Sequence, residues 1–309
     1  MPDWRLKAGA QKLLSLLPDR MYDELLYRSG SLRLGPDLLH DRFSHAARHL
    51  NAWVEQHPNT RPARLLELGT GWVPLVPLGL WLCGCEQIFT ADLRDHFRPA
   101  LLHSLIQSLD NEQHISLLQE TLPDLQRERI YSENLKTVLD FISLIKNDYS
   151  DSYLPVSRIL GDARHLPLAD QSVDMIVSNN TFEHIPAEVI PGILRSFHRV
   201  LRPGGLMSHH IDMADHYSYF DSRISPWHFL RYSPGQWRWI ENRLQSQNRL
   251  RVSHFRQMME EAGFEIVRID NEVFDTDHFR KQALHRTFAA MAPEEAGVLH
   301  THIVTRRRG

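Results

Sequence analysis

The sequence predicts an α/β protein built on a mostly parallel, doubly wound sheet that is covered by helices. Two observations support this fold class. Short apolar runs typical of buried strands alternate with segments whose apolar residues recur at helical spacing. Several of these runs also end in glycine or polar residues, as expected where the carboxyl ends of parallel strands meet a ligand. The length of 309 residues allows one large domain with extensions or two modest domains.

The composition is that of a globular protein and argues against several functional classes. Hydrophobic residues make up 42% of the chain and charged residues 24%, with a formal net charge of -3. That charge gives no reason to expect nucleic acid as a partner, and the basic run at 306–308 is interpreted as a solvated tail. Cys83 and Cys85 are too few and too close for a disulfide framework or a complete zinc site, so we expect reduced core thiols. We find no signal peptide or apolar membrane span, and therefore expect a cytoplasmic location without an integral membrane segment.

The first part of the chain predicts helices followed by two strands. Residues 1–60 form a predicted N-terminal helical extension that stops at Pro58. "ARLLELGT" predicts a buried strand, "PLVPLGLWLCG" a helix closed by Gly84, and "EQIFTADL" a second strand. Residues 94–157 keep helical spacing over a length too great for an ordinary connection, which predicts a helical insertion. We expect it to form a cap over the ligand edge of the sheet, with a dimerisation arm as the alternative.

The remaining elements complete a second predicted region, residues 61–309, which contains the insertion. "SRILGDARHLPLADQSVDMIVSNNTFEHIP" predicts a short strand, a turn and a buried strand, and "PAEVIPGILRSFHRVLRPGG" a helix ended by a turn at 203–205. "GLMSHHIDM" predicts the next strand. Residues 213–240 predict an aromatic and histidine-rich loop on the substrate side. "SHFRQMMEEAG" then predicts a helix, and "FEIVRIDNEVF" and "VLHTHIVTRRR" predict the closing strands.

A glycine turn follows the first predicted strand. In "ELGTG", Gly69 and Gly71 permit a tight turn that leaves amide groups exposed beside a helix N-terminus, where anions are favoured. A dinucleotide fingerprint needs a third glycine three residues after the second, and Pro74 stands there instead. About 20 residues further on, Asp92 ends the second strand and is placed to accept both hydroxyls of a ribose.

Four sequence motifs carry a resemblance to a known family. "LLELGTG", "ADL", "GDARHLPLADQSVDMIVSNNTFEHIP" and "HRVLRPGGLM" resemble, in order and spacing, the successive motifs of the class I S-adenosylmethionine-dependent methyltransferases, from about Arg64 to Asp212. The resemblance implies a seven-stranded Rossmann-like methyltransferase fold and S-adenosyl-L-methionine as the cofactor. Since this cofactor has no pyrophosphate, the resemblance is compatible with Trp72 and Pro74 in the glycine turn.

The same resemblance implies which residues bind the cofactor. Asp162 can accept from the exocyclic amine of adenine while the amide of Ala163 donates to a ring nitrogen. The full set comprises Glu67 and the carbonyl of Asn179 for the methionine amino group, Gly69 and Gly71 for the methionine part, Asp92 and Leu93 for the ribose, and Asp162 and Ala163 for adenine.

Methyl transfer from a sulfonium needs mainly alignment, which contributes up to roughly 7 to 11 kcal/mol in well-oriented reactions. A base is required when the acceptor is a hydroxyl. The candidate catalytic residues are Glu183, His184 and His210, since a histidine can take up a proton near neutrality. Successive residues of a strand face opposite sides of the sheet, so only one of His209 and His210 can face the site.

A metal site is not the favoured interpretation of the sequence. One group of residues raised the possibility of a metal that clamps a diol, but no spacing fixes a pair of ligands on one helix. That group consists of His209, His210, Asp212, Asp215 and His216.

The function that the sequence favours is methyl transfer from S-adenosylmethionine to a small-molecule, glycan or lipid-linked acceptor, with oxygen as the favoured atom. A homodimer is a possible assembly. One alternative is an NAD(P)-dependent oxidoreductase, suggested by the glycine turn and Asp92 and opposed by Pro74. The other is a non-catalytic S-adenosylmethionine-binding module, suggested by the absence of an unambiguous base.

Overall fold

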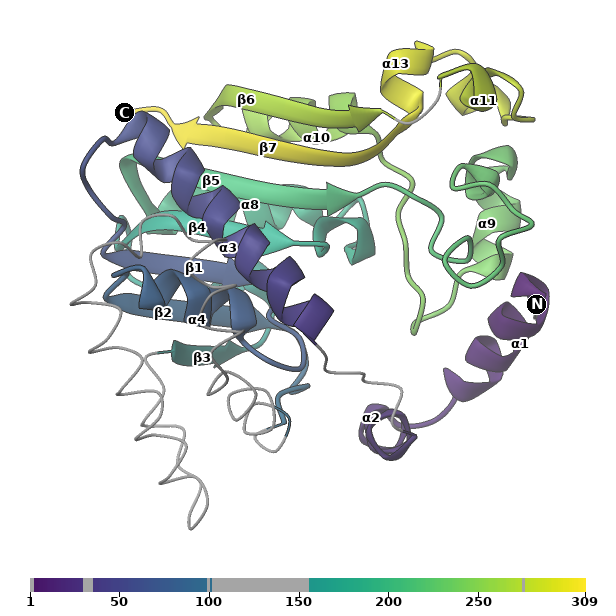
Figure 1. The fold of residues 1–309 in the computed structure, drawn as a ribbon, viewed down its shortest axis with the longest axis horizontal. Helices are drawn as coiled ribbons and strands as arrows, with labels where there is room; N and C mark the ends of the chain where they lie inside the picture. The colour runs from purple at the N-terminus through teal and green to yellow at the C-terminus, as the bar shows by residue number, and fades with distance from the viewer. Residues whose placement is uncertain (1–2, 30–35, 99–100, 102–155, 274–275) are drawn as a thin grey trace. The chain divides into compact units, whose positions relative to one another are not determined.

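The computed structural model describes residues 3–29, 36–98, 101, 156–273 and 276–309 (Figure 1). The predicted insertion at 94–157 lies almost entirely outside these residues. The chain divides into two compact units, described separately below. Unit 1 comprises Met1–Leu32, Asn180–Arg195 and His209–Thr305, and unit 2 comprises Arg33–Asn179, Ser196–Ser208 and Arg306–Gly309.

Within the described residues, seven strands form one sheet. They are β1 (Arg64–Leu68), β2 (Gln87–Asp92), β3 (Val156–Leu160), β4 (Val173–Asn179), β5 (Leu201–Asp212), β6 (Phe264–Val273) and β7 (Val298–Arg307). Their order is β3-β2-β1-β4-β5-β7-β6. The pairs β2–β3, β1–β2 and β1–β4 are parallel, whereas β6 and β7 run antiparallel (Figure 1). The doubly wound, mostly parallel sheet predicted from the sequence is confirmed.

Unit 2 has its core between two helices and the parallel strands. β4 is buried at every position, and its central residues, Met175 to Val177, are apolar as expected for a strand covered on both faces. The helices α3 (Pro36–Gln56) and α4 (Leu75–Leu82) pack on each other, with Phe43, Leu50 and Trp53 of α3 almost fully buried. Cys83 and Cys85 follow α4 and are free thiols, as the sequence predicted.

A close approach between these helices should make Gly79 intolerant of a side chain. A Cβ added at Gly79 would lie 2.7 Å from Cδ1 of Phe43 and 2.9 Å from Cβ of Ala46. We expect Gly79→Ala to lower the free energy of unfolding by about 1 to 2 kcal/mol, because overpacking outweighs the gain in helix propensity. Chemical denaturation measures this change. Gly9→Ala is the matched control, because its Cβ would meet nothing within 4 Å, and it should not destabilise. Equal stability of the two variants would contradict the prediction.

Unit 1 is built from the remaining elements. Its apolar cluster is rich in aromatic residues, including Trp227, Phe229 and Trp237. Trp4 of the first helix joins this cluster, and its backbone N–H donates to Oδ2 of Asp221 at 3.0 Å. The helices of this unit are α1 (Trp4–Leu14), α2 (Asp19–Arg28), α9 (Pro234–Ile240), α10 (Val252–Glu261), α11 (Thr276–Arg280), α12 (Arg286–Ala289) and α13 (Pro293–Ala296).

Two local expectations were wrong, and three short helices were not predicted. The turn predicted at 203–205 lies within β5, which begins directly after α8 (Ile190–Val200). A Cβ at Gly205 would lie 2.7 Å from the carbonyl oxygen of Asp174, so glycine there permits close backbone approach rather than a chain reversal. The predicted loop at 213–240 contains α9 and the short 3-10 helix η5 (His228–Arg231), and the short helices α11 to α13 were not predicted.

Among the described residues, the structure contains no helix with both the length and the apolar character needed to cross a membrane.

Candidate functional site

The glycine turn after β1 has the backbone conformation that the sequence predicted. Gly69 has φ +79° and Gly71 has φ +71°, a region that residues with a side chain rarely adopt. A Cβ on Gly71 would meet nothing within 4 Å, so the backbone angle and not crowding requires glycine there. The N–H of Gly69 donates to the carbonyl of Ala91 at 2.9 Å, which joins the turn to β2.

Asp92 ends β2 and is hydrogen-bonded to this turn. Its Oδ2 accepts from the N–H of Gly71 at 3.0 Å, and its Oδ1 accepts from the N–H of Arg94 at 3.4 Å. A carboxylate offers about four lone pairs, so each oxygen can accept one more hydrogen bond. Asp92, Thr70 and Gly71 line a pocket together with residues of β3. The neighbouring Leu93 is 71% exposed, so its side chain is open to solvent.

Glu67 is a buried acid on β1. Its side chain is 4% exposed, and the Thr70 hydroxyl donates to its Oε2 at 2.7 Å. Burial raises the pKa of Glu67 to about 7, although the hydrogen bond from Thr70 acts in the opposite direction. The side chain is therefore poised between its protonated and ionised forms near neutral pH.

Asn179, at the end of β4, is held by a histidine that the sequence reasoning missed. Nε2 of His49 donates to Oδ1 of Asn179 at 3.1 Å, and Nδ1 of His49 accepts from the Ser208 hydroxyl at 2.7 Å. His49 is fully buried on α3. Its position on the apolar face of that helix, between Phe43 and Trp53, was the available signal, because a buried polar side chain must have partners.

Asp162 precedes the 3-10 helix η3 (Ala163–His165) and accepts from the backbone N–H of Arg164 at 2.9 Å. The guanidinium of Arg164 contacts both carboxylate oxygens, at 2.5 to 3.0 Å. These hydrogen bonds hold the pKa of Asp162 low, at about 2. Asp162 is thus ionised, but an adenine amine would have to share it with Arg164. Ala163 is buried.

Two of the candidate catalytic residues lie in the 3-10 helix η4 (Phe182–His184) of unit 1, which Asn248 holds in place. The side chain of Asn248 donates to the carbonyls of Phe182 and Ile185, at 2.7 and 2.8 Å. Glu183 is 2% exposed, and among the described residues neither of its carboxylate oxygens has a hydrogen-bond partner. Burial raises the pKa of Glu183 well above its usual value, and the charge of Asp212 adds to the effect.

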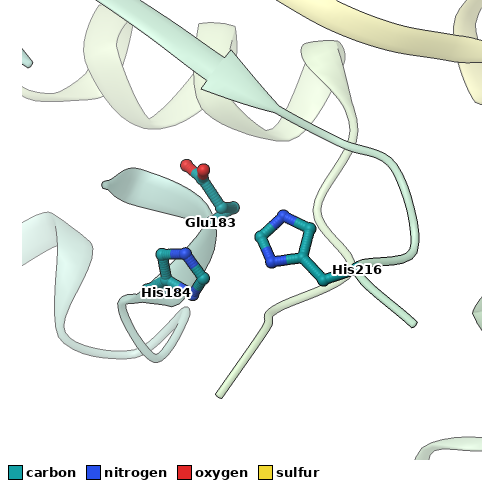
Figure 2. Close-up of side chains that lie close together, drawn as sticks. All are labelled: Glu183, His184 and His216. Atoms are coloured by element: carbon teal, nitrogen blue, oxygen red, sulfur yellow. The ribbon is translucent and has the colours of Figure 1, made fainter. Parts of the chain in front are cut away.

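His216, from the loop after β5, lies beside η4. Figure 2 shows Glu183, His184 and His216 gathered in one place. The rings of His184 and His216 have centroids 5.0 Å apart. Nδ1 of His184 donates to the carbonyl of Ser246 at 2.7 Å, while Nε2 of His216 lies 3.2 Å from Oδ2 of Asp212. His184 is exposed, so solvent reaches this cluster.

The third candidate, His210, lies on β5. Its Nδ1 donates to Oδ1 of Asn180 at 2.9 Å, and its ring stacks on that of His300 with centroids 5.8 Å apart. His209 is fully buried against Phe182, with ring centroids 4.8 Å apart, and burial lowers its pKa to about 3. His209 is therefore a neutral core residue. This agrees with the alternation of side chains along a strand, by which His209 and His210 face opposite sides of the sheet.

The group of five residues that suggested a metal does not form as a unit. His209 is in the core, and Asp215 pairs with Nδ1 of His228 at 3.1 Å. Of the five, only His216 belongs to the group that the structure brings together. In that group, one ligand atom each from Glu183, His184 and His216 lies within 4.8 Å of the others.

Part of this chain is similar to known methyltransferases. Residues 131–208 match the family model described as "Methyltransferase domain". A malonyl-[acyl-carrier protein] O-methyltransferase from Xylella fastidiosa (strain M23) is 49% identical over 53 residues, 17% of this chain and 17% of the relative. The protein of the same name from Dechloromonas aromatica (strain RCB) is 43% identical over 54 residues, 18% of this chain and 20% of the relative. The matched segments thus span a fifth or less of these curated relatives.

Solved structures also resemble the chain at low sequence identity. A chain of the complex between the Haloferax volcanii Trm112 methyltransferase activator and a candidate methyltransferase is 16% identical, with a TM-score of 0.44, covering 89% of this chain and 94% of that one. An S-adenosylmethionine-dependent methyltransferase from Mesorhizobium loti is 13% identical, with a TM-score of 0.38, covering 83% and 96%.

Proposed function

We propose that this chain is a class I S-adenosylmethionine-dependent methyltransferase and that it transfers the methyl group of S-adenosylmethionine to an oxygen of a small-molecule, glycan or lipid-linked acceptor. The observation that carries the proposal is the glycine turn after β1, whose Gly71 N–H is hydrogen-bonded to Asp92 at the end of β2. This arrangement sets an acidic side chain, with acceptor capacity to spare, at the end of β2 beside a sharp backbone turn, as a ribose requires.

Unit 2 carries the proposed cofactor residues. In this proposal Asp92 and Leu93 bind the ribose, and Asp162 and Ala163 bind adenine. The methionine part is bound by Gly69, Gly71, Glu67 and the carbonyl of Asn179. Glu67 suits a cationic amino group, because binding a positive charge beside it would favour its ionised form over the protonated form that burial favours.

The proposed transfer is an in-line displacement. The acceptor oxygen forms a bond to the methyl carbon as the carbon–sulfur bond breaks, and the bonding electron pair stays on sulfur. A hydroxyl acceptor must also lose its proton. In this proposal His210 accepts the proton of the hydroxyl. Its Nδ1–H donates to Asn180, so its Nε2 carries the basic lone pair. His184 has a similar tautomer, fixed by Ser246.

The two curated relatives support oxygen as the methylated atom. Both are O-methyltransferases that act on malonyl-[acyl-carrier protein]. A carboxylate acceptor of that kind is already ionised at neutral pH and needs no general base. The acceptor class thus decides whether His210 has a role in proton transfer.

The proposal predicts saturable binding of S-adenosylmethionine and S-adenosylhomocysteine to the full chain, measured by isothermal titration calorimetry. A thermal melt with NAD or NADP is the matched comparison and should show no stabilisation. Absence of binding to both sulfur compounds at millimolar concentration would contradict the proposal, and stabilisation by a dinucleotide alone would favour an oxidoreductase. Binding with no turnover on any carboxylate or hydroxyl acceptor tested would favour a non-catalytic binding module.

A further inference from the structure

We infer that Glu183, His184 and His216 form a binding site for a divalent first-row transition metal ion such as Zn²⁺, Mn²⁺ or Co²⁺. The three residues come from two separate segments of unit 1, the 3-10 helix η4 and the loop after β5. One potential ligand atom from each lies within 4.8 Å of the others, and the three side chains gather in one place (Figure 2). This inference concerns metal binding and stands independently of the proposed methyl transfer.

His184 is oriented as metal-bound histidines usually are, and His216 lies close to a carboxylate. A ligating imidazole typically gives its second ring nitrogen to a carboxylate or a backbone carbonyl, which fixes the tautomer and the ring. His184 gives Nδ1 to the carbonyl of Ser246 at 2.7 Å, and His216 has Nε2 at 3.2 Å from Oδ2 of Asp212. Nε2 of His184 is thereby left as the unprotonated nitrogen that can bind a cation, and His216 offers one ring nitrogen beside it.

Asp212 is itself held in place. The hydroxyl of Tyr219 donates to its Oδ2 at 2.7 Å, and the N–H of Ala214 donates to its Oδ1 at 2.8 Å. A carboxylate fixed in this way can orient the His216 ring without turning toward the ion. This is the arrangement that a supporting carboxylate behind a metal-bound histidine requires.

Glu183 supplies the observation that points to a missing cation. Its side chain is 2% exposed, and within the described part of the chain the backbone N–H groups of Glu183 and Asp212 act on its carboxylate without forming hydrogen bonds of full geometry. A buried carboxylate without such hydrogen bonds is costly, and buried charges are normally paired or bound to metals. A divalent ion between Glu183 and the two imidazoles would satisfy this carboxylate.

The donor set selects the class of ion. Two imidazoles and one carboxylate suit Zn²⁺, Mn²⁺, Fe²⁺ or Co²⁺, whereas Mg²⁺ prefers oxygen ligands alone. Ligand atoms bound at about 2.0 to 2.2 Å lie roughly 3.0 to 3.6 Å apart, so the side chains must close by about 1 to 2 Å. His184 is exposed, which gives the ion a path from solvent.

Co²⁺ titration of the full chain, stripped of metal with a chelator and free of any polyhistidine tag, tests the inference. We expect one Co²⁺ per chain, with visible absorption bands of a low-coordinate site that Zn²⁺ displaces. Glu183→Gln and His216→Gln should each weaken Co²⁺ binding by about 100-fold or more, and Asp212→Asn by about 10- to 100-fold. Glu183→Gln keeps the size of a side chain whose neutral form burial already favours, so it should fold even if His216→Gln does not.

Glu188→Gln and His278→Gln are the matched controls, because both change exposed residues of the same unit and should bind Co²⁺ as the wild type does. Absence of Co²⁺ binding at millimolar concentration would overturn the inference. Unchanged affinity in Glu183→Gln, or preference for Mg²⁺ over Co²⁺, would do the same. None of these readouts uses S-adenosylmethionine, so their failure is distinct from failure of the proposed function.

Discussion

Replacing Asp92 with alanine is expected to weaken the binding of S-adenosylhomocysteine by about 1 to 3 kcal/mol, or roughly 5- to 150-fold in affinity. The carboxylate is the proposed acceptor for both ribose hydroxyls. It also accepts from the N–H of Gly71, so its loss releases one hydrogen bond that holds the glycine turn. Isothermal titration calorimetry measures the change directly.

Two further variants separate these contributions. Asp92→Asn keeps an oxygen that can accept from Gly71 but removes the charge, so its affinity should fall between wild type and Asp92→Ala. Asp170→Ala is the matched control, because Asp170 is 72% exposed, pairs with Arg199, and should leave cofactor binding unchanged. If Asp92→Ala binds S-adenosylhomocysteine as tightly as Asp170→Ala, the ribose does not lie at the end of β2.

Replacing Glu67 with glutamine should flatten the pH dependence of stability. Because the native pKa of Glu67 is about 7 against an ordinary value of 4.5, the native state holds this proton more strongly than the unfolded state. The wild-type free energy of unfolding should therefore fall as pH rises from about 4.5 to 7, by roughly 3 kcal/mol from this group. Glu67→Gln cannot ionise at this position. Its free energy of unfolding relative to that of the wild type should therefore increase from pH 4.5 to 7 and stay constant above that.

Urea denaturation of both proteins at several pH values, without cofactor, measures this difference. Glutamine can still accept from the Thr70 hydroxyl, so the packing around β1 is preserved. Glu86→Gln, at an exposed position just before β2, is the control. Its free energy of unfolding should change with pH in the same way as that of the wild type. A constant difference between Glu67→Gln and wild type from pH 4.5 to 8 would show that Glu67 ionises normally.

The sheet could be predicted because each strand contains a short run of apolar residues that can be recognised in the local sequence. The centre of β4, Met175 to Val177, is apolar, and the apolar run of β1 ends at the glycine turn. Short helices were harder to predict from the sequence, because a helix such as α9 is stabilised by the burial of Trp237 in the core of unit 1. Ser233 and Gln236 form a capping box there, and this spacing was a signal that the sequence offered.

Side-chain clusters could be predicted only in part. Glu183 and His184 are adjacent in the sequence, so the sequence indicates them together, but His216 lies 32 positions after His184 and its sequence neighbours are Asp212 and Asp215. Its distance to η4 depends on the loop after β5, where the Asp212 contact and the bond from the His216 N–H to Gln247 hold it. No periodic pattern encodes such a contact, because it results from tertiary packing.

The contact between Trp4 and the core of unit 1 bears on how shortened versions of this protein would behave. Trp4 is 6% exposed and lies against the rings of Tyr217 and His228, with centroids 5.5 and 5.0 Å away. A truncation that removes α1 would uncover these aromatic surfaces and leave Asp221 without the N–H of Trp4. Such a fragment should aggregate more readily, whereas limited proteolysis of the full chain should spare the segment around Trp4.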